Sequence, residues 1–208
     1  MDSNISINDN RLWDSLMEMA KIGPGVAGGN NRQTLTSDDG IGRKLLHKWC
    51  KEAGMEMKVD QLGSMFFTRK GDQNDLFPVV IGSHLDTQPT GGKYDGVLGV
   101  LAGLEIIRTL NDLDLITKRP IMLVNWTNEE GCRFPPSLMA SSSYAGMYDV
   151  EKILKTKDSE GLIFEDELSK IGWKGSEKVG NQKMYSYFEL HIEQGPMLQN
   201  EKIDIGVV

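Results

Sequence analysis

The sequence has little of what would mark a membrane, secreted or redox-active protein. Its 208 residues include only two cysteines, and Cys50 and Cys132 are too far apart to form a CxxC metal or redox motif. The longest apolar run, around residues 77–81, is far shorter than the roughly 20 residues that a membrane span requires. The polar, acidic N-terminal stretch lacks the basic start and apolar middle of a secretory signal. These absences predict no membrane partner and a cytoplasmic location.

The sequence also lacks a block of basic residues. It has 30 acidic against 23 basic residues and a formal net charge of -7, which disfavours a nucleic-acid partner or an anionic membrane surface. Hydrophobic residues make up 39% of the chain and charged residues 25%, a balance typical of a globular protein with one sizeable core. Cys50 is predicted to be buried on the apolar side of a helix. Cys132 has no base beside it in the sequence and is not predicted to be a nucleophile.

The first third of the chain shows helical spacing followed by strand alternation. Apolar residues recur at helical spacing from Asp9 to Ile22, and a second helix is predicted from a cap at Ser37 to a stop at Gly54. The lone His47 of this helix is interpreted as a surface or satisfied histidine. Residues 55–59 and 64–71 then predict a hairpin.

Two continuous β-branched runs, residues 77–84 and 118–130, flank a helical pattern at residues 96–112. Strand, helix and strand in this order predict an α/β fold with a mixed sheet flanked by helices. A further helix is predicted at 164–173. Two more strands are predicted, one at 183–193 and one at 203–208. Because the chain stops within the last apolar strand pattern, we expect it to be truncated.

Histidines and carboxylates follow the ends of the predicted strands. The residues are His84 and Asp86 after one strand, Asp95 before the next helix, Glu129 and Glu130 after the second strand, and His191 with Glu193 near the end of a later one. The carboxyl ends of strands in an open α/β sheet are where ligands bind, so these side chains can converge. Imidazoles mixed with carboxylates suit zinc and also accept manganese, cobalt or nickel. The pattern therefore predicts a metal site, with a solvated acidic rim as the alternative.

The glycines of this region do not predict a nucleotide site. The stretch "GGKYDGVLG" does not fit GxGxxG, and Asp95 at the start of the helix would repel a phosphate. The glycines are instead interpreted as residues that let the backbone turn tightly between His84 and Asp95.

Three stretches, "GSHLDTQPTGGKYDGVLGVLAGLE", "TNEEGCRFPPSLMASSSYAG" and "ELHIEQGPML", resemble the dinuclear-metal amidohydrolases that split linear amides. The branch they resemble contains N-carbamoyl-L-amino-acid hydrolases, β-ureidopropionases and allantoate amidohydrolases. The resemblance implies a zinc-exopeptidase-like catalytic domain that hydrolyses the C–N bond of a small carbamoyl or ureido compound. An N-carbamoyl-L-amino acid, giving an amino acid, ammonia and carbon dioxide, is the substrate we expect. Allantoate or 3-ureidopropionate is the alternative.

The resemblance also implies a role for each site residue. Two divalent metal ions are expected, one bound by His84 and His191, the other by Glu130, with Asp95 bridging both. Glu129 would be the general base, Asp86 would orient His84, and Gln194 would lie close to the substrate. A contact between Asp86 and His84 is expected because a metal-binding imidazole usually donates its other N–H to a carboxylate.

Members of this family are considerably longer than the present chain. The resemblance therefore implies that residues 1–208 are the N-terminal portion of the metal-binding catalytic domain. The dimerisation or lid domain, with its substrate-binding arginine, and the C-terminal portion, with a further histidine ligand, would be absent. The full-length protein is expected to be a homodimer. Two alternatives remain, a metal-binding fragment without activity and a metallopeptidase or aminoacylase, although "NEEGCRF" and "HIEQGP" favour the carbamoylase branch.

Overall fold

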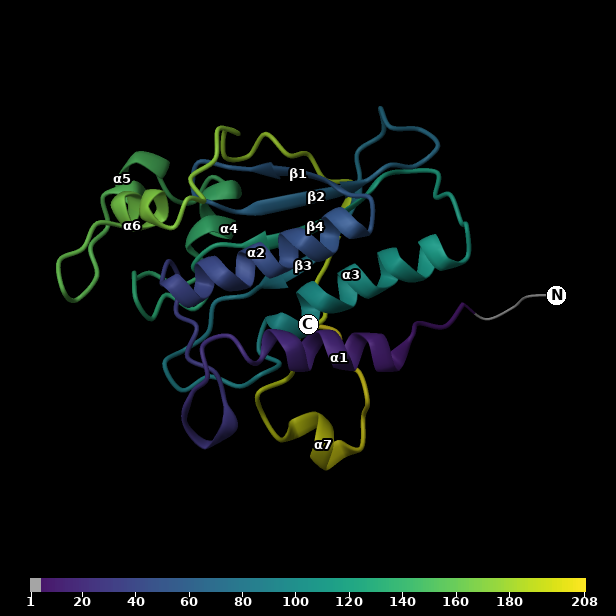
Figure 1. Cartoon of the computed structure of the whole chain (residues 1–208), viewed down its shortest axis with the longest axis horizontal. Coiled ribbons are helices and arrows are strands. Elements are labelled where there is room, and N and C mark those ends of the chain that lie inside the picture. Colours follow the sequence, from purple (N-terminus) through teal and green to yellow (C-terminus); the bar gives the residue numbers. More distant parts are fainter. Residues whose placement is uncertain (1–4) are drawn as a thin grey trace.

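The structure, a computed structural model, describes residues 5–208 and contains one mixed sheet with helices on both faces (Figure 1). Its strand order is β1-β2-β4-β3-β5. The strands are β1 (Glu56–Val59), β2 (Met65–Arg69), β3 (Val79–His84), β4 (Ile121–Trp126) and β5 (Ser186–Phe188). The predicted α/β fold with a mixed sheet is confirmed.

The direction of the strands decides where a site can form. β1 and β2 are an antiparallel hairpin, as predicted, and β2 is also antiparallel to β4. β3, in contrast, runs parallel to both β4 and β5. The carboxyl ends of β3, β4 and β5 therefore meet at one edge of the sheet, which is the place where open α/β sheets bind ligands.

One face of the sheet is covered by α2 (Ser37–Glu52) and α3 (Val97–Asp112) (Figure 1). Gly103 of α3 packs so closely that an added Cβ would lie 2.7 Å from a methyl carbon of Leu123 in β4. On α2, the ring of His47 lies 6.3 Å from the ring of Phe67 in β2. The prediction that Cys50 is buried is confirmed, since it has no exposed surface. His47 is partly buried, and its ring lies beside Phe67 and Trp173.

The opposite face of the sheet is covered by α4 (Met139–Tyr144). The rings of Phe66 and Trp126 meet edge to face there, with centroids 5.7 Å apart, and Tyr144 of α4 lies 5.3 Å from Trp126. Because successive side chains of a strand point to opposite faces, Phe66 packs on the α4 side of the sheet and Phe67 packs on the α2 side.

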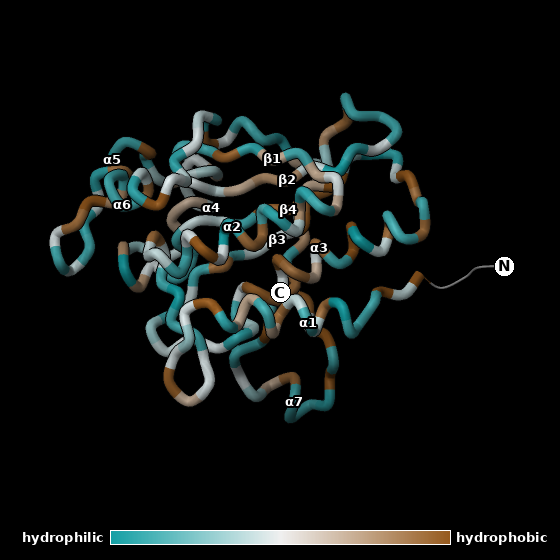
Figure 2. Tube along the Cα trace, viewed as in Figure 1, coloured by the Kyte–Doolittle hydropathy of each residue, from teal (hydrophilic) through white to brown (hydrophobic). Residues whose placement is uncertain are grey.

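The remaining helices surround this core: α1 (Asp9–Met19), the short 3-10 turn η1 (Val26–Gly28), α5 (Val150–Leu154), α6 (Phe164–Lys170) and α7 (Met197–Glu201). The helices predicted at 9–22 and 164–173 are thus confirmed. Hydrophobic residues concentrate in the strands and the covering helices, whereas the loop between β2 and β3 is mostly hydrophilic (Figure 2). No helix within residues 5–208 combines the length and the apolar character that crossing a membrane would need.

Two local predictions were wrong, and one was right only in part. The cap of α2 is Thr36, whose hydroxyl accepts from Asp39 N at 3.3 Å, and Ser37 is already the first helical residue. The predicted strand at 183–193 is only Ser186–Phe188, and residues 203–208 form no strand. A strand requires a neighbour for its backbone hydrogen bonds, and no segment of the described chain pairs with residues 203–208.

The turn between β1 and β2 is built around a buried carboxyl group. Asp60 is 1% exposed, and its Oδ1 accepts from the backbone N–H groups of Leu62 and Ser64, both at 2.9 Å. Its Oδ2 is buried and has no partner. Burial raises the pKa of Asp60 to about 6, because the charged form is poorly solvated there.

This carboxyl group should make stability depend on pH. Its pKa in the folded protein lies above the unfolded value, so its contribution is fully present below about pH 4 and is lost as the pH rises through about 6. Asp60→Asn should therefore be more stable than the parent at pH 7.5, by roughly 1–3 kcal/mol. Denaturant unfolding of both proteins from pH 4 to 8 measures this difference. A difference that does not grow with pH would contradict the assignment.

Candidate metal centre

The site lies at the shared carboxyl edge of β3, β4 and β5. His84 is the last residue of β3 and is completely buried. Glu129 and Glu130 follow the end of β4, and His191 lies just beyond β5. Asp95 comes from the loop that leads into α3. The structure therefore brings together the residues that the sequence pattern placed at strand ends.

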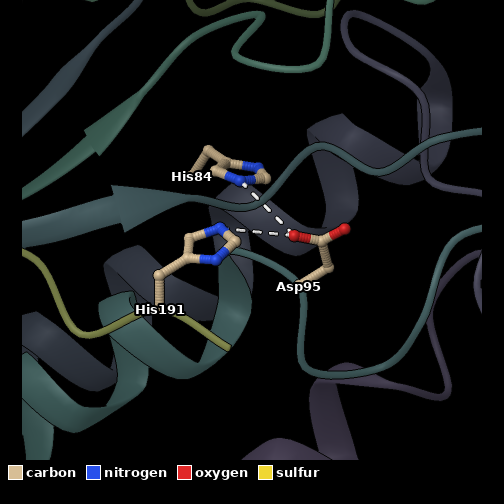
Figure 3. A group of neighbouring side chains, drawn as sticks. All are labelled: His84, Asp95 and His191. Carbon is tan, nitrogen blue, oxygen red and sulfur yellow. Dashed lines mark ion pairs between the residues drawn. The ribbon is translucent and has the colours of Figure 1, made fainter. Parts of the chain in front are cut away.

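Two histidines and one aspartate face each other (Figure 3). The Nε2 atom of His191 is 3.3 Å from Oδ1 of Asp95, and the Nε2 atom of His84 is 4.0 Å from the same oxygen. The two imidazole rings are stacked with centroids 5.8 Å apart. The ligand atoms of these three residues all lie within 4.8 Å of one another, so one ion could contact them together.

The orientation of His84 leaves one ring nitrogen without a partner. Its Nδ1 lies 2.8 Å from the backbone carbonyl oxygen of Asp86, to which it can donate. That contact assigns the free lone pair to Nε2, which points toward Asp95 and Glu129. Nε2 is buried and has no hydrogen-bond partner. A buried acceptor facing carboxylates is unfavourable unless a proton or a cation lies between them.

The carboxylate of Asp86 accepts hydrogen bonds from the backbone of both glutamates. Its Oδ1 accepts from Glu129 N at 3.3 Å, and its Oδ2 accepts from Glu130 N at 3.2 Å. It lies 3.8 Å from His84 Nδ1, beyond hydrogen-bond distance. The side chain of Asp86 was expected to orient His84. In the structure the backbone carbonyl of Asp86 makes this contact instead. The side chain instead fixes the loop that presents Glu129 and Glu130.

A second group of ligand atoms comes from His84, Glu129 and Glu130. Oε2 of Glu129 is 3.3 Å from His84 Nε2, and 26% of its side-chain surface is exposed. Oε1 of Glu130 is buried and has no hydrogen-bond partner. The two glutamates therefore differ, since the side chain of Glu129 is partly exposed and that of Glu130 has a buried oxygen without a partner.

The electrostatics of the site favour a positive charge. Burial, followed by the charge of Asp95, raises the pKa of Glu130 to about 7. Burial is also the largest cause that raises the pKa of Glu129 and of Asp86. For His84, burial lowers the pKa, but the charges of Asp86 and Glu129 outweigh it and the pKa is raised. The raised pKa of His84 and the contribution of Asp95 to that of Glu130 reflect the negative charges gathered here, which a divalent cation would balance.

Gly96 is a site residue that the sequence pattern did not single out. Its φ is +65°, and an added Cβ would lie 2.4 Å from the Nε2 and Cε1 atoms of His84. The backbone after Asp95 therefore passes directly over the imidazole ring. The Asp-Gly pair just before an apolar helix was the available signal, because glycine readily adopts a positive φ.

Gln194 and Cys132 lie around the metal centre. The side-chain amide of Gln194 donates to Oδ2 of Asp95, which places it beside the predicted ligands. Cys132 is exposed, and burial together with the charge of Glu130 raises the pKa of its thiol. A raised pKa keeps the thiol protonated, in agreement with the prediction that Cys132 is not a nucleophile.

Comparison with known proteins shows which family the chain matches. Residues 80–208, more than half of the chain, match the model of peptidase family M20/M25/M40. The chain is 63% identical over 205 residues to an N-carbamoyl-L-amino-acid amidohydrolase of Rhizobium meliloti, covering 99% of this chain and 49% of that protein. It is 35% identical to an N-carbamoyl-L-amino acid amidohydrolase of Geobacillus stearothermophilus, covering 97% of this chain and 50% of that protein.

A solved structure has the same fold. The crystal structure of a hydantoinase/carbamoylase family amidase from Burkholderia multivorans superposes with a TM-score of 0.94 at 49% identity. The match covers 96% of this chain and 49% of that one. The chain thus spans about half the length of the relatives that it matches.

The contact between Gly96 and His84 can be tested by adding one methyl group. Gly96→Ala should displace the imidazole and weaken zinc binding by about tenfold or more, since supports of metal ligands typically contribute 10- to 100-fold. Gly92→Ala is the matched control, because nothing lies within 4 Å of a Cβ there. Competition with a chromophoric chelator measures the affinity. Equal affinities of the two variants would show that the close approach does not matter.

Proposed function

Because the chain belongs to peptidase family M20/M25/M40, we propose that it forms the metal-binding part of an amidohydrolase that splits N-carbamoyl-L-amino acids. The observation that carries this proposal is the pair of buried, unpartnered atoms, Nε2 of His84 and Oε1 of Glu130, on two residues whose ligand atoms lie within 4.8 Å of one another. The 63% and 35% identical relatives are both named N-carbamoyl-L-amino-acid amidohydrolase, which supports this class of substrate.

We propose that this donor set binds two divalent cations. His84, Asp95 and His191, whose ligand atoms lie within 4.8 Å of one another, would hold one ion. Glu130 would hold the second, and Asp95 would be shared by both. Imidazole and carboxylate ligands suit zinc first and accept manganese, cobalt or nickel. When bound, such ions supply Lewis acidity, lowering the pKa of water toward 7 and polarising the substrate carbonyl.

Glu129 is the residue proposed to move the proton. Its side chain is partly exposed, and its backbone N–H donates to the carboxylate of Asp86, which fixes the loop at this residue. It would take a proton from the attacking water and return it to the nitrogen that leaves. The amide of Gln194, beside Asp95, would donate to the substrate. The products of a carbamoyl substrate would be an amino acid, ammonia and carbon dioxide.

We also propose that residues 1–208 are the N-terminal portion of the catalytic domain of a longer, homodimeric cytoplasmic enzyme. The half-length coverage of the relatives supports this organisation. A lid or dimerisation domain and a C-terminal catalytic portion would then supply the remaining histidine ligand and the substrate-binding arginine. The full-length protein is therefore the material for activity measurements.

The three histidines offer a direct test of the metal assignment. His84→Ala and His191→Ala should each lose at least one bound zinc ion, because each removes a ligand of the same ion. His47→Gln is the control, since His47 packs against Phe67 and Trp173 away from the cluster. Elemental analysis after gel filtration gives the metal content. Retention of the full complement by His191→Ala would contradict the proposed ligand set.

The role of Glu129 is tested by Glu129→Gln in the full-length protein. Ammonia release from an N-carbamoyl-L-amino acid should fall by roughly 10²- to 10⁴-fold, the usual contribution of a general base, while bound metal remains. Glu160→Gln, at an exposed turn, is the matched control. Unchanged turnover in Glu129→Gln would remove this residue as the base.

Ammonia release by the parent only from allantoate or 3-ureidopropionate would reassign the substrate within the branch.

A further inference from the structure

The metal ligand His191 lies beyond the part of the sheet that holds its strand. The pairing of β3 with β5 ends at Ile81 and Phe188, and His191 is three residues further along the chain. Its side chain contacts the neighbouring Ile192 carbonyl oxygen through Nδ1 and Asp95 through Nε2, and its ring stacks on that of His84. Some other group must therefore fix the backbone between β5 and His191.

We propose that Glu189 is a positioning residue for His191, which it holds by tying the end of β5 to Ser83 of β3; this inference rests on the proposed metal centre. Ser83 Oγ donates to Glu189 Oε1 at 2.5 Å, which extends the connection between the two strands past the last backbone pair. Ser83 is completely buried and directly precedes His84. The same contact therefore joins the neighbours of two predicted ligands.

A second hydrogen bond connects Glu189 to the third strand. Tyr187 Oη donates to Glu189 Oε2 at 2.6 Å and accepts from Trp126 Nε1 at 3.1 Å. Trp126 is the last residue of β4, just before the loop that carries Glu129 and Glu130. Glu189 is thus the point at which side chains from the ends of β3, β4 and β5 are joined.

The chemistry of this junction favours a carboxylate. Both donors are hydroxyl groups, one on each oxygen, and Glu189 forms no ion pair within residues 5–208. Hydrogen bonds from O–H groups to a charged carboxylate are short and about twice as strong as neutral ones. An amide at this position would present N–H to one of the hydroxyls, so glutamine should replace glutamate only in part.

The adjacent backbone is positioned from the other side by α3. An added Cβ at Gly99 would lie 2.6 Å from the carbonyl oxygen of Leu190, so this segment rests directly on the first turn of the helix. Glu189 belongs to neither group of candidate ligands. It therefore acts on the centre through the placement of His191 rather than by binding an ion.

A double-mutant cycle with zinc as the probe tests the proposal in the full-length protein. Glu189→Ala should weaken zinc binding by about 10- to 100-fold, as loss of an outer support typically does, and Ser83→Ala should act in the same direction. In the His191→Ala background, Glu189→Ala should not weaken the remaining zinc binding any further, because the residue that it positions is gone. Glu160→Ala is the control for removal of an exposed carboxylate. Affinity is measured by chelator competition, and the absorption bands of the cobalt-substituted protein report the ligand geometry.

The outcomes separate this inference from the proposed function. An equally large effect of Glu189→Ala with and without His191 would mean that Glu189 supports the fold in general and would overturn the positioning role. Zinc binding that requires His191 but is indifferent to Glu189→Ala would also overturn it while leaving the metal centre intact. A parent protein that binds no zinc would overturn both. Thermal unfolding of the metal-free variants should differ little from that of the metal-free parent.

Discussion

The burial of His84 among carboxylates is the constraint on which the rest of the site depends. The imidazole has no exposed surface, and its Nε2 faces Asp95 and Glu129 without a hydrogen-bond partner. Such a group is tolerated only if its position is fixed and its surroundings can accept a positive charge. The parallel register of β3 with β4 supplies the first condition by placing His84 opposite Trp126, next to the loop of Glu129 and Glu130. The excess of carboxylates supplies the second.

Backbone groups do much of the positioning in this site. The carbonyl of Asp86 orients the imidazole of His84, and the N–H groups of Glu129 and Glu130 bind the carboxylate of Asp86. The far side of the same loop is held by Arg133, which pairs with Asp158 at 3.1 Å and with Glu167 at 2.7 Å. The loop is therefore fixed at both ends, on one side by the strand that carries His84 and on the other by the segment around α6. Its two glutamates can then point in different directions without moving the backbone.

The sequence predicted the parts of this arrangement that depend on local pattern. The apolar runs of β3 and β4, the helix between them and the polar residues at their ends were sufficient to place His84, Asp95, Glu129 and Glu130 at one edge. The length of β5 was not predictable, because residues 189–193 have the composition of a strand but find no backbone partner beyond Ile81. The cap of α2 was misplaced by one residue, since Thr36 and Ser37 are both good caps and only the tertiary contacts of the loop decide between them. The short helices α4, α5 and α7 carry too few residues for a periodic pattern.

The distribution of arginines indicates that the negative charge of the site is kept free for a cation. Elsewhere in the described chain, two buried carboxylates are neutralised by arginine, Asp39 by Arg43 at 3.0 Å and Glu105 by Arg11 at 2.7 Å. Within residues 5–208, no lysine or arginine pairs with any of the four carboxylates around His84, which are Asp86, Asp95, Glu129 and Glu130. A permanent internal cation would lower the energy of the empty site but would compete with a bound ion for the same oxygens. Histidine does not compete in this way, because a neutral imidazole offers a lone pair to the metal. The residues that make the metal-free site electrostatically unfavourable thus leave its oxygens and its imidazole lone pairs available to a cation.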